Sequence, residues 1–177
     1  ETRVVAPDTY FVQGLTAMGS SANQNFISNA AFVVTGDGVI VIDSLGSPPL
    51  ARQLLSLIRR VTPQPIRHVV LTHCHADHWL GLEQVVAATG ATTYAAEPEV
   101  TEIPIATDVA LHDGDKIRLG DTTLEVVWLT GHRASYLEHV STSAALIYRD
   151  PDGSAHVFAG DCLFPGGIGN TCDDPAA

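Results

Sequence analysis

The chain has 177 residues, a mass of 18.7 kDa and a hydrophobic content of 45%. This size and composition predict one domain with a buried core over residues 1–177 and exclude a disordered chain. The formal net charge of -11 argues against binding to a nucleic-acid backbone or to an anionic membrane surface. Because no apolar run reaches the roughly 18 residues that span a membrane, we also expect no membrane association.

The compartment stays open on sequence grounds. The chain begins with Glu1 instead of Met, which a removed secretory signal or a trimmed chain would explain. Its three cysteines, Cys74, Cys162 and Cys172, form no CxxC motif and indicate no disulfide framework. A periplasmic or secreted location is favoured over a cytoplasmic one.

The first part of the chain predicts strands followed by a helix. Apolar, β-rich runs at residues 29–35 and 39–43 flank a Gly-Asp-Gly turn, and an earlier strand is expected at 10–14. Asp43 closes the second of these runs, where it either orients a neighbouring histidine or caps the loop. A helix over residues 48–61 is predicted by two prolines at its start and by an apolar stripe.

A cluster of metal-ligand side chains follows the next predicted strand, residues 66–72. His73, His75, Asp77 and His78 lie on the loop between this strand and a following helix. Imidazole and carboxylate groups suit zinc, and iron or manganese less exclusively. Ligands of α/β proteins bind beyond the carboxyl ends of the strands, so this pattern predicts a metal site. A solvated, histidine-rich turn is the alternative.

The elements after this cluster continue an α/β pattern. A helix over residues 81–90 leads to a strand at 92–95, and a surface connection is expected over 97–107. Turn signals then predict a β-meander with strands at residues 109–111, 116–118 and 122–129.

Two further ligand candidates follow predicted strands. His132 comes after the meander and lies beside Gly131, which permits a close backbone approach. Strands are expected at residues 144–148 and 156–159, and Asp161 comes shortly after the second of them.

The combined pattern resembles the metallo-β-lactamase superfamily of metallohydrolases. The resemblance covers residues 29–164, and its HxHxDH motif is highly specific. Asp161, in place of a cysteine, makes the ligand pattern similar to that of glyoxalase II, and the amino-terminal half also resembles exported bacterial members. The resemblance implies an αββα sandwich with the site at one edge, between the two sheets.

The resemblance also implies a dinuclear metal site. The family supplies one more histidine to the second metal from a later loop, but no histidine follows His156 here. The carboxyl-terminal part therefore looks short, as in a truncated domain or in one whose edge is completed by another chain of a homo-oligomer. The implied ligands are, for the first metal, His73, His75 and His132, and for the second, Asp77 and His78, with Asp161 bridging the two.

Several residues outside this set have alternative interpretations. Arg133 stands where the family commonly has a small hydroxyl residue, and it could face an anionic substrate or form a surface salt bridge. Trp79 could line a substrate pocket or fill the core. The histidines outside the motifs are interpreted as surface or strand residues, and His139 is the candidate for a replacement ligand.

These features predict a metal-dependent hydrolase that binds one or two zinc ions and a small-molecule substrate. Zinc lowers the pKa of bound water from about 15.7 to about 7, so a metal-bound hydroxide could attack a thioester, ester, lactone or β-lactam. Asp77 would orient this nucleophile and relay a proton. One alternative is a persulfide dioxygenase, whose resemblance assigns a single iron to His73, His132 and Asp161. The other is an incomplete domain that binds metal without turnover.

Overall fold

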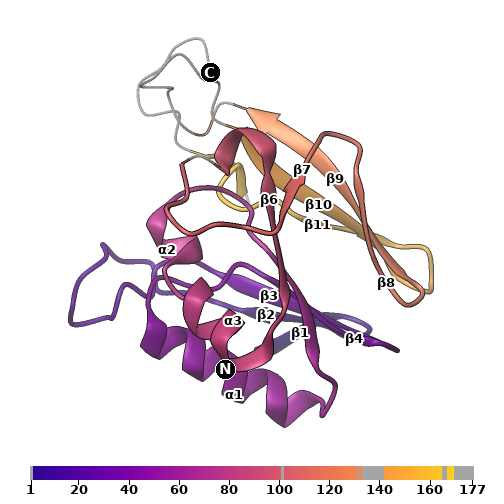
Figure 1. The fold of residues 1–177 in the computed structure, drawn as a ribbon, viewed down its shortest axis with the longest axis horizontal. Helices are drawn as coiled ribbons and strands as arrows, with labels where there is room; N and C mark the ends of the chain where they lie inside the picture. The colour runs from indigo at the N-terminus through magenta and orange to yellow at the C-terminus, as the bar shows by residue number, and fades with distance from the viewer. Residues whose placement is uncertain (1, 101, 131, 133–141, 165–166, 170–177) are drawn as a thin grey trace.

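The computed structural model describes residues 2–100, 102–130, 132, 142–164 and 167–169. A seven-stranded sheet and a four-stranded sheet face each other, and a short hairpin follows them in the chain (Figure 1). Helices cover the outer face of the seven-stranded sheet. The predicted α/β sandwich is therefore confirmed, with α, β and β layers in the described part of the chain.

The seven-stranded sheet has the order β1-β2-β3-β4-β5-β6-β7. Strands β1 to β4 pair antiparallel, as successive hairpins do, and β4 to β7 pair parallel. The predicted hairpin of β3 and β4 is confirmed, whereas β1 was not predicted. The strands are β1 Thr2–Ala6, β2 Thr9–Val12, β3 Ala30–Thr35, β4 Gly38–Ile42, β5 Ile66–Val70, β6 Thr92–Ala96 and β7 Val109–Leu111.

Helix α1 shows the apolar stripe that the sequence predicts. Leu50, Leu54 and Ile58 recur at helical spacing and are buried against the sheet. The connection after β6 is less exposed than expected, because Ile103 is only 3% exposed. Within the described ranges, no helix is long and apolar enough to cross a membrane. The helices are α1 Pro48–Val61, α2 Ala76–Trp79, α3 Leu82–Thr89 and the 3-10 helix η1 Glu97–Glu99.

Strand β4 lies at the centre of both cores. Its Val39 and Val41 pack under the helices, whereas Ile40 and Ile42 face the second sheet. All five residues of the strand are buried. This explains its continuous apolar run, because a strand covered on both faces cannot alternate polar and apolar side chains.

The four-stranded sheet has the order β11-β10-β9-β8 and is antiparallel. The predicted meander is wrong at its first strand, because residues 109–111 form β7 and pair with β6 in the other sheet. The turn over residues 112–115 carries the chain from one sheet to the other, so its turn residues gave a misleading hairpin signal. The remaining strands are β8 Lys116–Leu119, β9 Thr122–Thr130, β10 Thr142–Arg149, β11 Ala155–Phe158, β12 Leu163–Phe164 and β13 Gly167–Ile168.

Candidate metal centre

Two adjoining elements position the HxHxDH motif. Strand β5 is followed by a loop that carries His73 and His75, and the short helix α2 carries Asp77 and His78. His73 and His78 are 3% and 2% exposed, so packing holds both imidazoles in place. The motif therefore lies beyond the carboxyl end of a buried parallel strand, as predicted.

The first group of candidate ligands draws on both sheets. His75 Nδ1 lies 3.1 Å from His73 Nε2 and 3.3 Å from His132 Nε2. Asp161 comes shortly after β11, and its Oδ2 lies 3.8 Å from the Nε2 atoms of both His73 and His132. One ligand atom from each of these four residues lies within 4.8 Å of every other. This spacing allows a single cation to contact all four side chains.

A second group lies next to the first and shares one residue with it. His78 Nε2 lies 3.6 Å from Asp77 Oδ2 and 3.5 Å from Asp161 Oδ1. Because Asp161 directs Oδ2 towards the first group and Oδ1 towards the second, its carboxylate can bridge two cations. The structure thus brings together all six residues predicted from the sequence, and their role as metal ligands stays a prediction.

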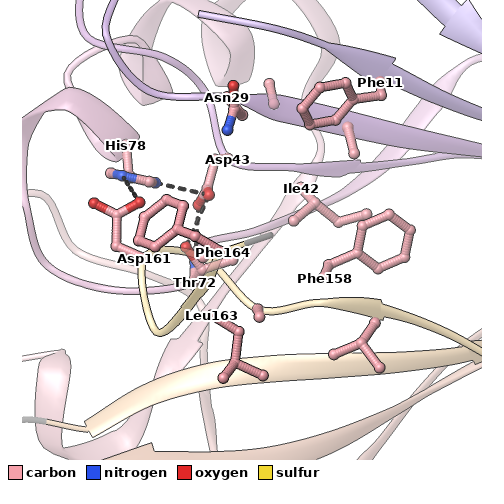
Figure 2. A pocket seen from close by; sticks show the side chains of 15 residues that line it. Phe11, Asn29, Ile42, Asp43, Thr72, His78, Phe158, Asp161, Leu163 and Phe164 are labelled. Carbon is pink, nitrogen blue, oxygen red and sulfur yellow. Dashed lines mark hydrogen bonds and ion pairs between the residues drawn. The ribbon is translucent and has the colours of Figure 1, made fainter. Parts of the chain in front are cut away.

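Asp43 fixes the orientation of His78 (Figure 2). Its Oδ2 lies 2.8 Å from His78 Nδ1, and its carboxylate accepts hydrogen bonds of 2.8 Å from both the backbone N–H and the hydroxyl of Thr72. An imidazole held through one nitrogen presents the other in a fixed direction, here towards Asp77 and Asp161. The interpretation that Asp43 orients a histidine is confirmed, whereas Thr72 was not predicted as part of the site.

Burial and neighbouring charges set the protonation of two candidate ligands. Burial, followed by the charge of His78, lowers the pKa of His73 to about 2, so this imidazole is neutral at pH 7 and offers a lone pair. Burial alone would raise the pKa of Asp161, but hydrogen bonding and charge from His78 outweigh it and lower this pKa to about 2. Both groups are therefore in the form that binds a cation.

The inward-facing nitrogen of His78 points to a positive charge in this site. His78 Nε2 is buried and faces the carboxylates of Asp77 and Asp161, which lie 3.6 and 3.5 Å from it. Burial lowers the pKa of His78, but the negative charges of Asp43 and Asp161 prevail and raise it to about 10. The surroundings of Nε2 thus favour a cation, which is either a proton or a metal ion. The donor set fits a divalent metal.

Backbone contacts near the site were not foreseen from the sequence. Ser28 and Ser44 donate hydroxyl hydrogen bonds to the carbonyl oxygens of α2 that belong to Asp77 and His78, respectively. Gly160 has a φ of +53°, and a Cβ at this position would lie 2.7 Å from a side-chain atom of the neighbouring β5 loop. Ser44, next to Asp43, carried a weak positional signal, and Ser28 carried none.

The other residues singled out from the sequence lie elsewhere or are not described. Trp79 donates a 2.7 Å hydrogen bond from Nε1 to the carbonyl oxygen of Cys74 and packs against the core, so it anchors the ligand loop. No other described histidine belongs to either ligand group. Arg133 and His139 lie outside the described residues, as does Gly131.

Curated relatives are similar to this chain in sequence. Hydroxyacylglutathione hydrolase from Hahella chejuensis is 31% identical over 137 residues, which cover 77% of this chain and 47% of that protein. The enzyme of the same name from Methylococcus capsulatus is 35% identical over 109 residues, which cover 62% of this chain and 38% of that protein. The chain therefore spans about half the length, or less, of these curated relatives.

Solved structures share the fold. A metallo-beta-lactamase from Cronobacter sakazakii with a mutated HARLDQ motif has a TM-score of 0.73 and 21% identity, covering 94% of this chain and 66% of that chain. The metallo-beta-lactamase GOB-18 from Elizabethkingia meningoseptica has a TM-score of 0.67 and 22% identity, covering 84% and 55%. The family model of the Metallo-beta-lactamase superfamily matches residues 24–173. This chain therefore belongs to the metallo-beta-lactamase superfamily.

Proposed function

We propose that this protein is a zinc-dependent hydrolase that cleaves a thioester or a related acyl bond. The observation that carries the proposal is the convergence of two ligand groups on one shared carboxylate, that of Asp161. The name of the curated relatives, hydroxyacylglutathione hydrolase, describes hydrolysis of a thioester and supports this class first. Ester, lactone and β-lactam substrates share the same carbonyl chemistry and belong in the same screen.

In this proposal each ligand group would hold one metal ion. His73, His75 and His132 would hold the first zinc ion, and Asp77 and His78 the second, with Asp161 between them. Bound zinc lowers the pKa of a coordinated water to about 7 and polarises a carbonyl oxygen. The chain supplies the neutral imidazole of His73 at the first position and the carboxylates of Asp77 and Asp161 at the second.

Asp77 is the candidate for proton transfer. Its Oδ2 lies at the edge of the second ligand group, 3.6 Å from His78 Nε2, and its side chain is 19% exposed. A carboxylate in this position can orient the attacking water and accept its proton. Asp161 is the less suitable base, because it is shared by both ligand groups.

Metal analysis combined with hydrolysis tests the proposal. Purified protein should contain zinc, and His73→Ala or Asp77→Asn should lower kcat by at least about 100-fold on a panel of thioesters, esters, lactones and β-lactams. His112→Ala is the matched control, because this histidine is 65% exposed and belongs to neither group. Unchanged hydrolysis by metal-loaded His73→Ala would overturn the proposal.

A single-iron dioxygenase is the second candidate, because His73, His132 and Asp161 do meet in one group. The same samples discriminate between the two functions. One iron per chain with oxygen uptake on glutathione persulfide would favour the dioxygenase, whereas zinc with hydrolysis favours the first proposal.

A further inference from the structure

An apolar pocket opens between the two sheets beside the candidate metal centre. Phe11 and Ile42 of the first sheet line it together with Phe158 of β11 (Figure 2). Leu163 and Phe164 of β12 also line it and are 52% and 45% exposed. The pocket volume of about 370 Å³ falls within the range of small-molecule sites. Large apolar side chains left exposed together commonly mark a binding surface.

The pocket is continuous with the candidate metal centre. His78 and Asp161, which form part of the second ligand group, also belong to its lining. Asp43 and Thr72 lie beside them, and Figure 2 shows these polar side chains gathered on one side, away from Phe11 and Phe158. A ligand in the pocket would therefore have a reactive end at the candidate metals and a body among apolar side chains.

We propose that this pocket binds an apolar acyl group of the substrate, and this inference rests on the proposed hydrolase function. Beyond the polar end, the described lining residues offer aliphatic and aromatic side chains, except for Asn29, whose amide oxygen accepts a hydrogen bond from the backbone N–H of Gly14. A hydroxyl placed there would lose its hydrogen bonds to water without replacement, whereas an alkyl or aryl group would gain by burial. The protein should therefore prefer substrates with a hydrophobic acyl group over short hydroxyacyl substrates.

A series of straight-chain carboxylates tests this preference directly, because carboxylates are the acyl products of the proposed reaction. Acetate, butyrate, hexanoate and octanoate should bind zinc-loaded protein with a Kd that falls about three- to fourfold per methylene until the pocket is full. Isothermal titration calorimetry measures these constants without turnover. The corresponding 1-alkanols, titrated into metal-free protein, should show the same trend because the apolar walls need no metal.

A pair of surface variants localises the effect. Phe164→Ala should weaken octanoate binding by about tenfold, since the removed ring is one of the apolar side chains that line the pocket and would cover the alkyl chain. Ile168→Ala is the matched control, because Ile168 lies on the other strand of the same hairpin, is 74% exposed and is not part of the pocket lining. Its affinities should equal those of the wild type.

The outcomes separate this inference from the proposed function. Affinities that do not depend on chain length, for carboxylates and alkanols alike, would overturn the acyl pocket even if the protein hydrolyses short thioesters. The same result is expected if another polypeptide segment fills the pocket. Conversely, a chain-length trend in a protein that hydrolyses no acyl compound would support the pocket and reject the hydrolase.

Discussion

Replacing Asp43 with asparagine should change which nitrogen carries the proton in the neutral, metal-binding form of His78. The backbone N–H of Thr72 donates to Asp43 Oδ1 at 2.8 Å, so the asparagine oxygen must occupy this position. The amide nitrogen then takes the place of Oδ2, 2.8 Å from His78 Nδ1, and donates to it. An imidazole that accepts at Nδ1 carries its proton on Nε2, the nitrogen that faces Asp77 and Asp161.

The magnitude follows from these contacts. A proton on Nε2 blocks the lone pair that a metal in the second group needs. Loss of a residue that hydrogen-bonds to a metal-binding histidine typically lowers metal affinity by about 10- to 100-fold. Asp43→Asn should weaken the second metal by this factor and leave the first almost unchanged. Folding of the metal-free protein should lose about 1.5–3 kcal/mol, because a charge-assisted hydrogen bond inside the protein becomes a neutral one.

Competition titration against a zinc chelator measures both sites in one experiment. Wild-type protein should show two binding phases, and Asp43→Asn should show one unchanged phase and one weakened phase. Asp121→Asn is the control, because it makes the same substitution in the exposed turn between β8 and β9. Two wild-type phases in folded Asp43→Asn would refute the argument that Asp43 sets the protonation of His78.

Two further predictions concern stability. Metal-free protein should be most stable near pH 6.5. Below this pH the unfolded chain binds a proton at His73 that the folded protein, with a pKa of about 2, does not bind, so stability falls as the pH decreases. Above it the folded protein keeps a proton on His78, with a pKa of about 10, that the unfolded chain has lost, so stability falls as the pH increases. Urea unfolding at pH 5, 6.5 and 9 measures this, and a monotonic pH dependence would contradict it. Gly81→Ala should destabilise the fold by about 1–3 kcal/mol or more, because a Cβ there would lie 2.1 Å from the carbonyl oxygen of Ser44. Gly36→Ala, with open space around it, should be nearly neutral in the same thermal melts.

Local chemistry made the helices and the ligand motif predictable. Helix α1 begins at Pro48 and ends at Val61 as predicted, since a proline pair fixes its first turn and an apolar stripe fixes its buried face. The motif from His73 to His78 was recognisable because metal binding restricts both residue type and spacing within one loop. Signals of this kind lie within a few residues of one another, so one sequence suffices to read them.

Features that depend on tertiary packing were not predictable in the same way. Strand β7 leads into turn residues that are typical of a hairpin, and only its pairing with β6 assigns it to the first sheet. The hydrogen bond between Ser28 and the backbone of α2 joins distant parts of the chain, and a lone serine carries no signal for it. The protonation of His78 likewise arises from carboxylates at positions 43 and 161, which only the fold brings together.

Metal binding should couple to the packing of the two sheets, because His132 and Asp161 follow strands of the second sheet while the other ligands follow the first. Leu146→Ala and Leu54→Ala each truncate a fully buried leucine. Leu146 lies between the two sheets, and Leu54 lies on the face of α1 that packs against the first sheet. Both should cost about 2–5 kcal/mol in metal-free protein. Only Leu146→Ala should also weaken zinc binding to the folded state, since it loosens the contact that holds the two halves of the site in register. A zinc concentration of about 100 times the wild-type Kd should then stabilise the wild type and Leu54→Ala equally, by about 2.7 kcal/mol. The same concentration should stabilise Leu146→Ala by less. Equal stabilisation of all three proteins at one zinc concentration would show that the sheets do not control the geometry of the site.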